Sequence, residues 1–297
     1  MKAAVAHRSS IDLARFVAAF GVVVAHAYAS INDWVGHLAL GLFLILTAFL
    51  AVQSAQRAGG SYAFVLRARR LILPWLVWSA FYRLIDLVFS HNPDRFVPLS
   101  DPWTLLYGSA IHLWFLPFVA LAMVLVAPAV RLIRGPGALG LASAGVAVLS
   151  VPLLVLHVQG WLPVPLPQWA FALPLYALGL LLGISHPMGK AWMPALAVAA
   201  MTGFAVWYSG NMPWAWTLIG SLVAFELFWR LPIRGRILPH LGQVAFGIYL
   251  VHPFFMLVVY KFMGAGVNPF LAAVLCFAMS WAATTVLRRL PLMARVL

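Results

Sequence analysis

The chain has 297 residues, of which 64% are hydrophobic and only 8% are charged, and its mean hydropathy is +0.99. Soluble globular domains carry about 25% charged residues, so the composition excludes an ordinary soluble protein and predicts a multi-pass membrane protein. The formal net charge of +13 suggests an anionic partner, but the positions of the basic residues along the chain give it another explanation.

Ten apolar segments approach the length of about 20 helical residues that crosses about 30 Å of hydrocarbon. They lie near 11–30, 36–54, 71–90, 112–132, 138–158, 168–185, 191–209, 214–229, 237–259 and 268–287. Because 168–185 and 214–229 are short, eight or nine spans is the alternative. The predicted fold is an all-α polytopic transmembrane helix bundle of about ten spans, in a single domain 1–297 with no additional soluble domain.

The basic residues alternate between the two sides of this predicted bundle. With the N-terminus inside, only Arg95 and Lys261 fall on the outer side. The cytoplasmic segments hold Lys2, Arg8, Arg57, Arg67, Arg69, Arg70, Arg131, Arg134, Lys190, Arg230, Arg234, Arg236, Arg288, Arg289 and Arg295. Because cytoplasmic loops of membrane proteins are enriched in Lys and Arg, we expect both termini to be cytoplasmic. The net positive charge is then explained by the membrane topology, and nucleic acid is not an expected partner.

The start of the chain also resembles a secretory signal peptide, with Ala27-Tyr28-Ala29 as the cleavage site. We expect this segment to be retained as the first span, because its removal would disturb the alternation of charges. The chain has three lysines against sixteen arginines, a composition typical of GC-rich bacterial genomes. This feature is one of composition only; the expected location is a bacterial cytoplasmic membrane.

The first segment carries three polar side chains on one helical face, Asp12, Arg15 and His26. Eleven helical steps bring His26 to within about 20° of Arg15 and about 16 Å further along the axis. Asp12 stands three residues before Arg15, a spacing at which it can neutralise the arginine. Charged groups inside a span normally face a cavity or a partner, so this face is predicted to line a pathway. The simpler alternatives are a snorkelling arginine at the interface and a buried histidine satisfied by a carbonyl group.

Two groups of charges mark the third segment. Arg67, Arg69 and Arg70 stand where it enters the membrane from the cytoplasm. One interpretation is positive-inside anchoring, and the other is phosphate binding, because guanidinium groups bind phosphate oxygens bidentately. Further along, Arg83 and Asp86 stand three residues apart. We expect them to form an intramembrane pair, either structural or part of a site.

Four histidines are predicted to lie at similar depth in the outer half of the bilayer: His26, His37, His112 and His252. Imidazole transfers protons near neutral pH, so acid–base chemistry is expected on that side. A metal site is a weaker interpretation, because the chain has no HxxxH or HExxH pair and no carboxylate is placed with the histidines.

Five sequence blocks follow one another along the chain: Asp12 with Arg15-x10-His26, then GLFLILTAFL at 41–50, Arg67-x-x-Arg70 with Pro74, HLWFLPF at 112–118 and GIYLVHPFF at 247–255. In this order they resemble the acyltransferase-3 family of integral-membrane O-acyltransferases. The resemblance implies a bundle of about ten helices that transfers an acyl group, most often acetyl, from cytoplasmic acyl-coenzyme A. The acceptor that the resemblance implies is a hydroxyl of an extracytoplasmic glycan or a lipid-linked saccharide. The chain departs from the family pattern at Thr47-Ala48, where a Ser-Gly pair is usual.

The resemblance also implies roles for individual residues. His26 is the expected catalytic histidine with Arg15 and Asp12 as its motif partners, and Arg67 and Arg70, with Arg69 beside them, are the expected coenzyme-side arginines. Acetyl-CoA is the expected co-substrate and no metal is expected. The expected partners are the bilayer and the saccharide acceptor, and the oligomeric state is left open. Supporting or acceptor-side positions are expected for Arg83, Asp86, His112, Trp114 and His252.

Two questions stay open at this point. His26 could act as a general base or could carry the acyl group covalently. A proton-coupled multi-pass transporter would also explain the intramembrane charges, although it predicts inverted repeats, which the sequence does not show. Tryptophans at the outer helix ends, such as Trp34, Trp161 and Trp214, are expected to form an interfacial belt, and a minority of them could stack on sugar rings.

Overall fold

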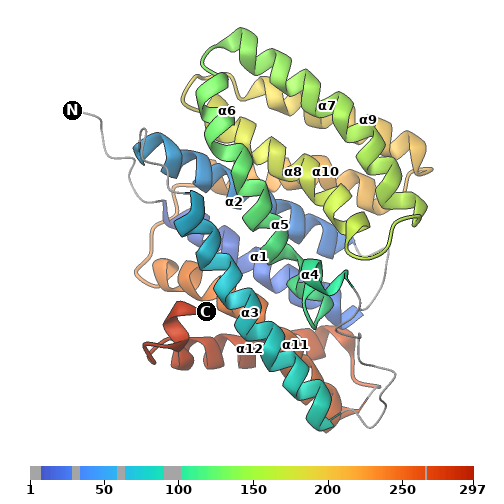
Figure 1. The fold of residues 1–297 in the computed structure, drawn as a ribbon, viewed down its shortest axis with the longest axis vertical. Helices are drawn as coiled ribbons and strands as arrows, with labels where there is room; N and C mark the ends of the chain where they lie inside the picture. The colour runs from blue at the N-terminus through green and yellow to red at the C-terminus, as the bar shows by residue number, and fades with distance from the viewer. Residues whose placement is uncertain (1–7, 29–33, 59–63, 90–101, 265) are drawn as a thin grey trace.

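The computed structural model describes residues 8–28, 34–58, 64–89, 102–264 and 266–297. Within these ranges every regular element is a helix, and each of the ten predicted spans contains one (Figure 1). The long helices are α1 (Ser9–Tyr28), α2 (Trp34–Ala58), α3 (Phe64–Phe89), α7 (Pro136–Gln159), α8 (Leu166–Ser185), α9 (Trp192–Tyr208), α10 (Pro213–Arg230), α11 (Leu238–Met263) and α12 (Pro269–Leu287).

The fourth span is interrupted rather than continuous. It consists of η3 (Ile111–Trp114), α5 (Phe115–Ala122), η4 (Met123–Leu125) and α6 (Val126–Leu132), and the short α4 (Thr104–Tyr107) precedes it. Pro117 and Pro128 each lie in the first turn of a helix, where the missing N–H is tolerated. Because Pro128 cannot donate to the carbonyl of Val124, the α-helical pattern breaks in η4 just before it.

Eight helical segments in the described ranges are long and apolar enough to cross a membrane, by length and composition. The segment at 166–185 is one of them, whereas α9 is shorter, with 17 residues, and α10 is not in this set. Both shorter helices nevertheless pack lengthwise in the bundle, α9 on α7 and α10 on α2 (Figure 1). The predicted all-α polytopic bundle is therefore confirmed.

The helices α1 and α2 form the centre of the bundle. Helix α1 packs against α2, α11 and α12, and α2 packs against α8 and α10 (Figure 1). Leu44, Ile45 and Leu46 are consecutive on α2 and each is at most 1% exposed, so α2 is apolar and buried all round, as a central helix must be. Helix α3 crosses the front of the bundle obliquely and is much less buried.

The pair Thr47-Ala48, which departs from the family pattern, lies where α2 crosses α8. A Cβ atom at Gly179 of α8 would lie 2.6 Å from the carbonyl oxygen of Ile45 and 2.8 Å from the Cβ of Ala48. The glycine on α8 thus supplies the space for the methyl group on α2, as small residues do between membrane helices. The hydroxyl of Thr47 donates within α2, to the carbonyl oxygen of Phe43 at 2.7 Å.

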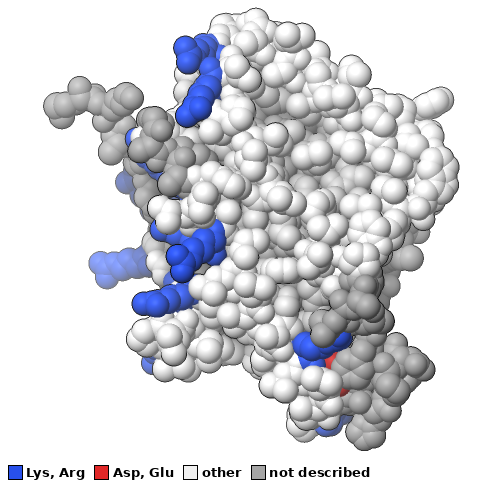
Figure 2. Space-filling model, in the orientation of Figure 1, with Lys and Arg blue, Asp and Glu red and all other residues white. Residues whose placement is uncertain are grey.

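Basic side chains gather at one end of the bundle (Figure 2). We name this the basic end; helices α1 and α3 begin there, and α2, α10 and α12 end there, bringing together Arg8, Arg57, Arg67, Arg230 and Arg288. A smaller group of basic and acidic side chains lies at the lower right of the view. The basic end is the one predicted to face the cytoplasm. The opposite end, where α1 ends and α2 begins, is the predicted outer end.

The crossing of α2 and α8 yields a stability prediction. Gly179→Ala places a methyl group against the backbone of α2, so we expect the free energy of unfolding to fall by about 1–3 kcal/mol, as overpacking does. Gly203→Ala on α9 is the matched control, because a Cβ atom there meets nothing within 4 Å. Thermal unfolding of both variants in one detergent checks this; equal melting temperatures would contradict the close crossing.

Candidate active site

A cavity of about 740 Å³ lies at the outer end of the bundle. Residues of α1, α2, η3, α5, α7, α8, α10 and α11 line it, so it lies where the central helices meet the surrounding ones. Four histidines line it: His26, His37, His112 and His157. His26 is exposed to this space. A histidine in a bilayer-spanning helix that faces a cavity can exchange protons with whatever enters the cavity.

His26 belongs to a cluster of three imidazole rings. The ring of His252 on α11 lies 5.0 Å from that of His26 and 5.5 Å from that of His112, measured between ring centroids. His252 is fully buried behind the two rings that line the cavity. The sequence placed these three histidines at one depth, and the structure brings them together.

Hydrogen bonds to backbone carbonyls orient this cluster. Nδ1 of His252 lies 2.7 Å from the carbonyl oxygen of Tyr249, and the hydroxyl of Tyr249 donates to the carbonyl of His112. Because a carbonyl only accepts, Nδ1 of His252 carries the proton, which assigns the lone pair to Nε2. Among the described residues, neither Nε2 of His252 nor Nε2 of His112 has a hydrogen-bond partner.

The other two histidines form a second group on the same cavity. His37 on α2 and His157 on α7 have ring centroids 5.5 Å apart. His37 was predicted at this depth, whereas His157 was not singled out. His157 stands near the outer end of the fifth span, so the sequence places it at the same depth as the four histidines that were singled out. Depth alone does not show which face of a helix meets the cavity.

Arg15 lies near the basic end of the same helix that presents His26. It is half-buried, with an attractive electrostatic interaction with Asp12 and a repulsive one with Arg288, the residue directly after α12. Asp12 is 8% exposed and packs directly on α11, since a Cβ atom at Gly242 would lie 2.6 Å from the Cγ of Asp12. The cavity reaches Val22, about 10 Å along the axis of α1 from Arg15.

The three arginines at the start of α3 differ in their surroundings. Nη2 of Arg67 donates to Oγ of Ser54 on α2 at 2.7 Å, which ties the first turns of α3 to α2. Arg69 and Arg70 are exposed at the basic end. These guanidinium groups are placed where an anionic group in the expected cytoplasm can reach them.

The remaining predicted site residues fall into two locations. Trp114 is buried and lines the cavity together with His112. Arg83 and Asp86 lie one turn apart in the second half of α3, both half-buried, and neither lines the cavity. The structure therefore does not bring this pair to His26.

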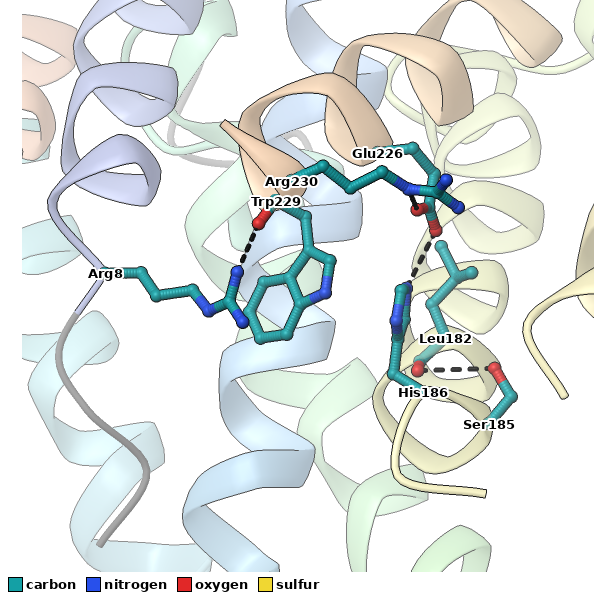
Figure 3. A network of polar contacts seen from close by, with 7 residues as sticks. All are labelled: Arg8, Leu182, Ser185, His186, Glu226, Trp229 and Arg230. Atoms are coloured by element: carbon teal, nitrogen blue, oxygen red, sulfur yellow. Dashed lines mark hydrogen bonds and ion pairs between the residues drawn. The ribbon is translucent and has the colours of Figure 1, made fainter. Parts of the chain in front are cut away.

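Glu226, the single glutamate of the chain, lies at the basic end in a polar network (Figure 3). Its Oε1 lies 2.8 Å from Nε2 of His186, and its Oε2 accepts from Nε of Arg230 at 3.0 Å. Nearby, Arg8 donates to the carbonyl of Trp229 and lies over its ring, 3.9 Å from the centroid. Both carboxylate oxygens of Glu226 are hydrogen-bonded. The bond to His186, the residue directly after α8, joins the end of α8 to α10.

The described residues contain no group of three or more His, Cys, Asp or Glu side chains arranged to hold a metal ion.

A helical membrane bundle with a histidine-lined cavity at one end and a basic surface at the other belongs to the class of multi-pass membrane proteins with an internal site. The family model described as an acyltransferase domain matches residues 8–289. The chain therefore belongs to the acyltransferase-3 family and is a membrane acyltransferase. No curated protein and no solved structure shows significant similarity to it.

The contact of Asp12 with Gly242 yields a prediction about Arg15. Asp12→Asn keeps the shape of the side chain but removes the charge beside a half-buried guanidinium, so we expect a loss of about 1–3 kcal/mol of stability. Gly242→Ala displaces the carboxylate and is expected to act in the same direction.

Gly145→Ala on α7 is the control for the Asp12→Asn and Gly242→Ala variants, because a Cβ atom at Gly145 meets nothing within 4 Å. Melting temperatures measured in nanodiscs check the prediction. Asp12→Asn and Gly145→Ala proteins that unfold at the same temperature would show that Asp12 does not stabilise Arg15.

Proposed function

We propose that this protein transfers an acetyl group from cytoplasmic acetyl-CoA to a hydroxyl of an extracytoplasmic glycan or lipid-linked saccharide, in a bacterial cytoplasmic membrane. The observation that supports this most is the arrangement on α1. His26 faces the outer cavity, and the half-buried Arg15 lies about 16 Å closer to the basic end. One helix thus links a basic surface to an acid–base group deep in the bundle.

The polarity of coenzyme A matches this arrangement. Its phosphates are anionic, and its thioester is uncharged and stands at the end of a long flexible arm. Arg67, Arg69 and Arg70 at the basic end would hold the phosphates by charge-assisted hydrogen bonds. The arm would then extend along α1 past Arg15 toward the cavity, where burial favours an uncharged group over a phosphate.

His26 is the proposed catalytic residue. In the direct route, neutral His26 accepts the proton of the acceptor hydroxyl while the hydroxyl oxygen bonds to the acyl carbon. The carbon–sulfur bond then breaks, and the coenzyme A thiolate takes up a proton. His112 and His252, whose Nε2 atoms have no partner among the described residues, would help to hold and pass on the proton.

In the alternative route, His26 attacks the thioester itself and carries the acyl group. The acceptor hydroxyl then takes the group from the histidine in a second step. The two routes differ in a measurable way, because only the second releases coenzyme A in one burst before any acceptor is added. Both routes require His26.

A proton-coupled transporter was the other function compatible with the intramembrane charges. Membership of the acyltransferase-3 family favours acyl transfer over transport. The acyltransferase is therefore the function we propose.

The central role of His26 predicts a loss of turnover. His26→Ala is expected to lower the release of coenzyme A from acetyl-CoA by about 100-fold or more, the usual contribution of a positioned base. His240→Gln is the control, because His240 lies in the first turn of α11, outside the cavity, with Nε2 3.3 Å from Oγ1 of Thr285. Labelled acetyl-CoA, an acceptor saccharide and purified protein in nanodiscs measure both rates, because the direct route releases coenzyme A only when an acceptor is present; full turnover in a folded His26→Ala protein would exclude the proposal.

The basic end yields a prediction about donor affinity. Arg70→Ala removes an exposed guanidinium from the proposed phosphate site, and we expect the Kd for coenzyme A to rise about ten-fold. Arg134→Ala removes the same charge from the loop after α6 and is the control for net charge. Equilibrium binding at two salt concentrations distinguishes the two variants. Equal Kd values would mean that only the overall charge matters.

A further inference from the structure

The cavity has a second group of side chains, away from the imidazole cluster of His26. It consists of His37, His157, Gln168 and Trp214, all of which line the cavity, and we name it the aromatic wall. The ring of His157 lies 5.1 Å from that of Trp214 and 5.0 Å from that of Phe171, which packs behind the wall. Four helices, α2, α7, α8 and α10, contribute to this group.

Two polar atoms of the aromatic wall are hydrogen-bond acceptors, Nε2 of His157 and the side-chain oxygen of Gln168, whereas the indole N–H of Trp214 and the amide NH2 of Gln168 are donors. Nδ1 of His157 lies 3.0 Å from the carbonyl oxygen of Pro167, so Nδ1 carries the proton and Nε2 has the lone pair. The side-chain oxygen of Gln168 is buried and has no hydrogen-bond partner among the described residues. A ligand that fits these atoms must donate hydrogen bonds, as hydroxyl groups do.

Two further observations restrict the chemical class of ligand that the aromatic wall can bind. The described residues that line the cavity include no Lys or Arg, so the wall does not suit a phosphate or a carboxylate. Trp214 is only 6% exposed, whereas Trp34, Trp161 and Trp216 are more than 50% exposed. Trp214 therefore differs from an interfacial belt tryptophan, which lies at the membrane surface. An apolar face beside hydroxyl-accepting atoms suits a neutral sugar ring.

We propose that the aromatic wall binds the neutral sugar ring of the acceptor, with Trp214 against the ring and Nε2 of His157 accepting one of its hydroxyls. The inference rests on the proposed function, because it takes the acceptor to be a saccharide. It extends that function by naming the residues that position the sugar. His26 lines the same cavity as the wall, so a sugar bound there would share that space with the proposed catalytic imidazole.

The test uses the full protein in nanodiscs with labelled acetyl-CoA and a panel of methyl glycosides of glucose, galactose, mannose, rhamnose and N-acetylglucosamine. At least one glycoside is expected to accept the label. For that glycoside, Trp214→Ala is expected to raise the KM about ten-fold, equivalent to about 1.4 kcal/mol of binding free energy. Trp216→Ala, two residues away on α10 and outside the cavity, is the matched control and is expected to leave the KM within about two-fold.

His157→Asn gives an independent variant, because asparagine can keep the donor to the Pro167 carbonyl while removing Nε2. It is expected to raise the same KM about five-fold, a smaller effect than loss of Trp214 because one hydrogen bond is removed. The Kd for coenzyme A, measured on every preparation, reports whether each variant is folded. If Trp214→Ala does not bind coenzyme A, the KM for the glycoside is measured on Trp214→Leu and His157→Asn instead.

The failures of the two proposals are distinguishable. If His26-dependent turnover of acetyl-CoA is present but no glycoside accepts the label, or if Trp214→Ala and Trp216→Ala behave alike, the sugar subsite is refuted and the acyltransferase proposal stands. If the unmodified protein neither binds coenzyme A nor turns over acetyl-CoA, the proposed function itself has failed, and the subsite with it.

Discussion

The positive charge of Arg15 inside a membrane-spanning helix is the constraint on which the rest of the arrangement depends. A half-buried guanidinium in an apolar bundle needs an opposite charge nearby, and Asp12, one turn away on α1, supplies it. Asp12 in turn packs against α11 at Gly242, where only a hydrogen atom leaves room for it. These contacts set the rotation of α1 in the bundle, and eleven residues further on the same rotation directs His26 to the cavity.

The two ends of the bundle provide different chemical environments. The basic end presents Arg69 and Arg70 to the expected cytoplasm, and the described residues that line the outer cavity include imidazole and aromatic side chains but no Lys or Arg. In the function we propose, an anionic donor and a neutral acceptor approach from opposite sides and meet near His26. The α2 and α8 crossing, in which Gly179 accommodates Ala48, gives this arrangement a rigid centre.

The sequence predicted the fold well because hydrophobic length and loop charge are properties of single segments. It also predicted that Asp12, Arg15 and His26 share a face, because helical periodicity is local. It missed His157, and it did not show that Arg83 and Asp86 lie off the cavity, because both depend on how separate helices turn toward each other. The interrupted fourth span likewise depends on where Pro117 and Pro128 fall within their helices, which their presence alone does not show.

The measurement that tests the central claim most directly follows the acetyl group across the membrane. The protein would be reconstituted into proteoliposomes in one orientation, with labelled acetyl-CoA only on the side of the basic end and a methyl glycoside accepted by the protein only on the other side. The account predicts that labelled acetyl glycoside forms on the side opposite the donor and that His26→Gln abolishes it. Label that remains entirely on the donor side, in protein that turns over acetyl-CoA, would contradict transfer through the His26 cavity.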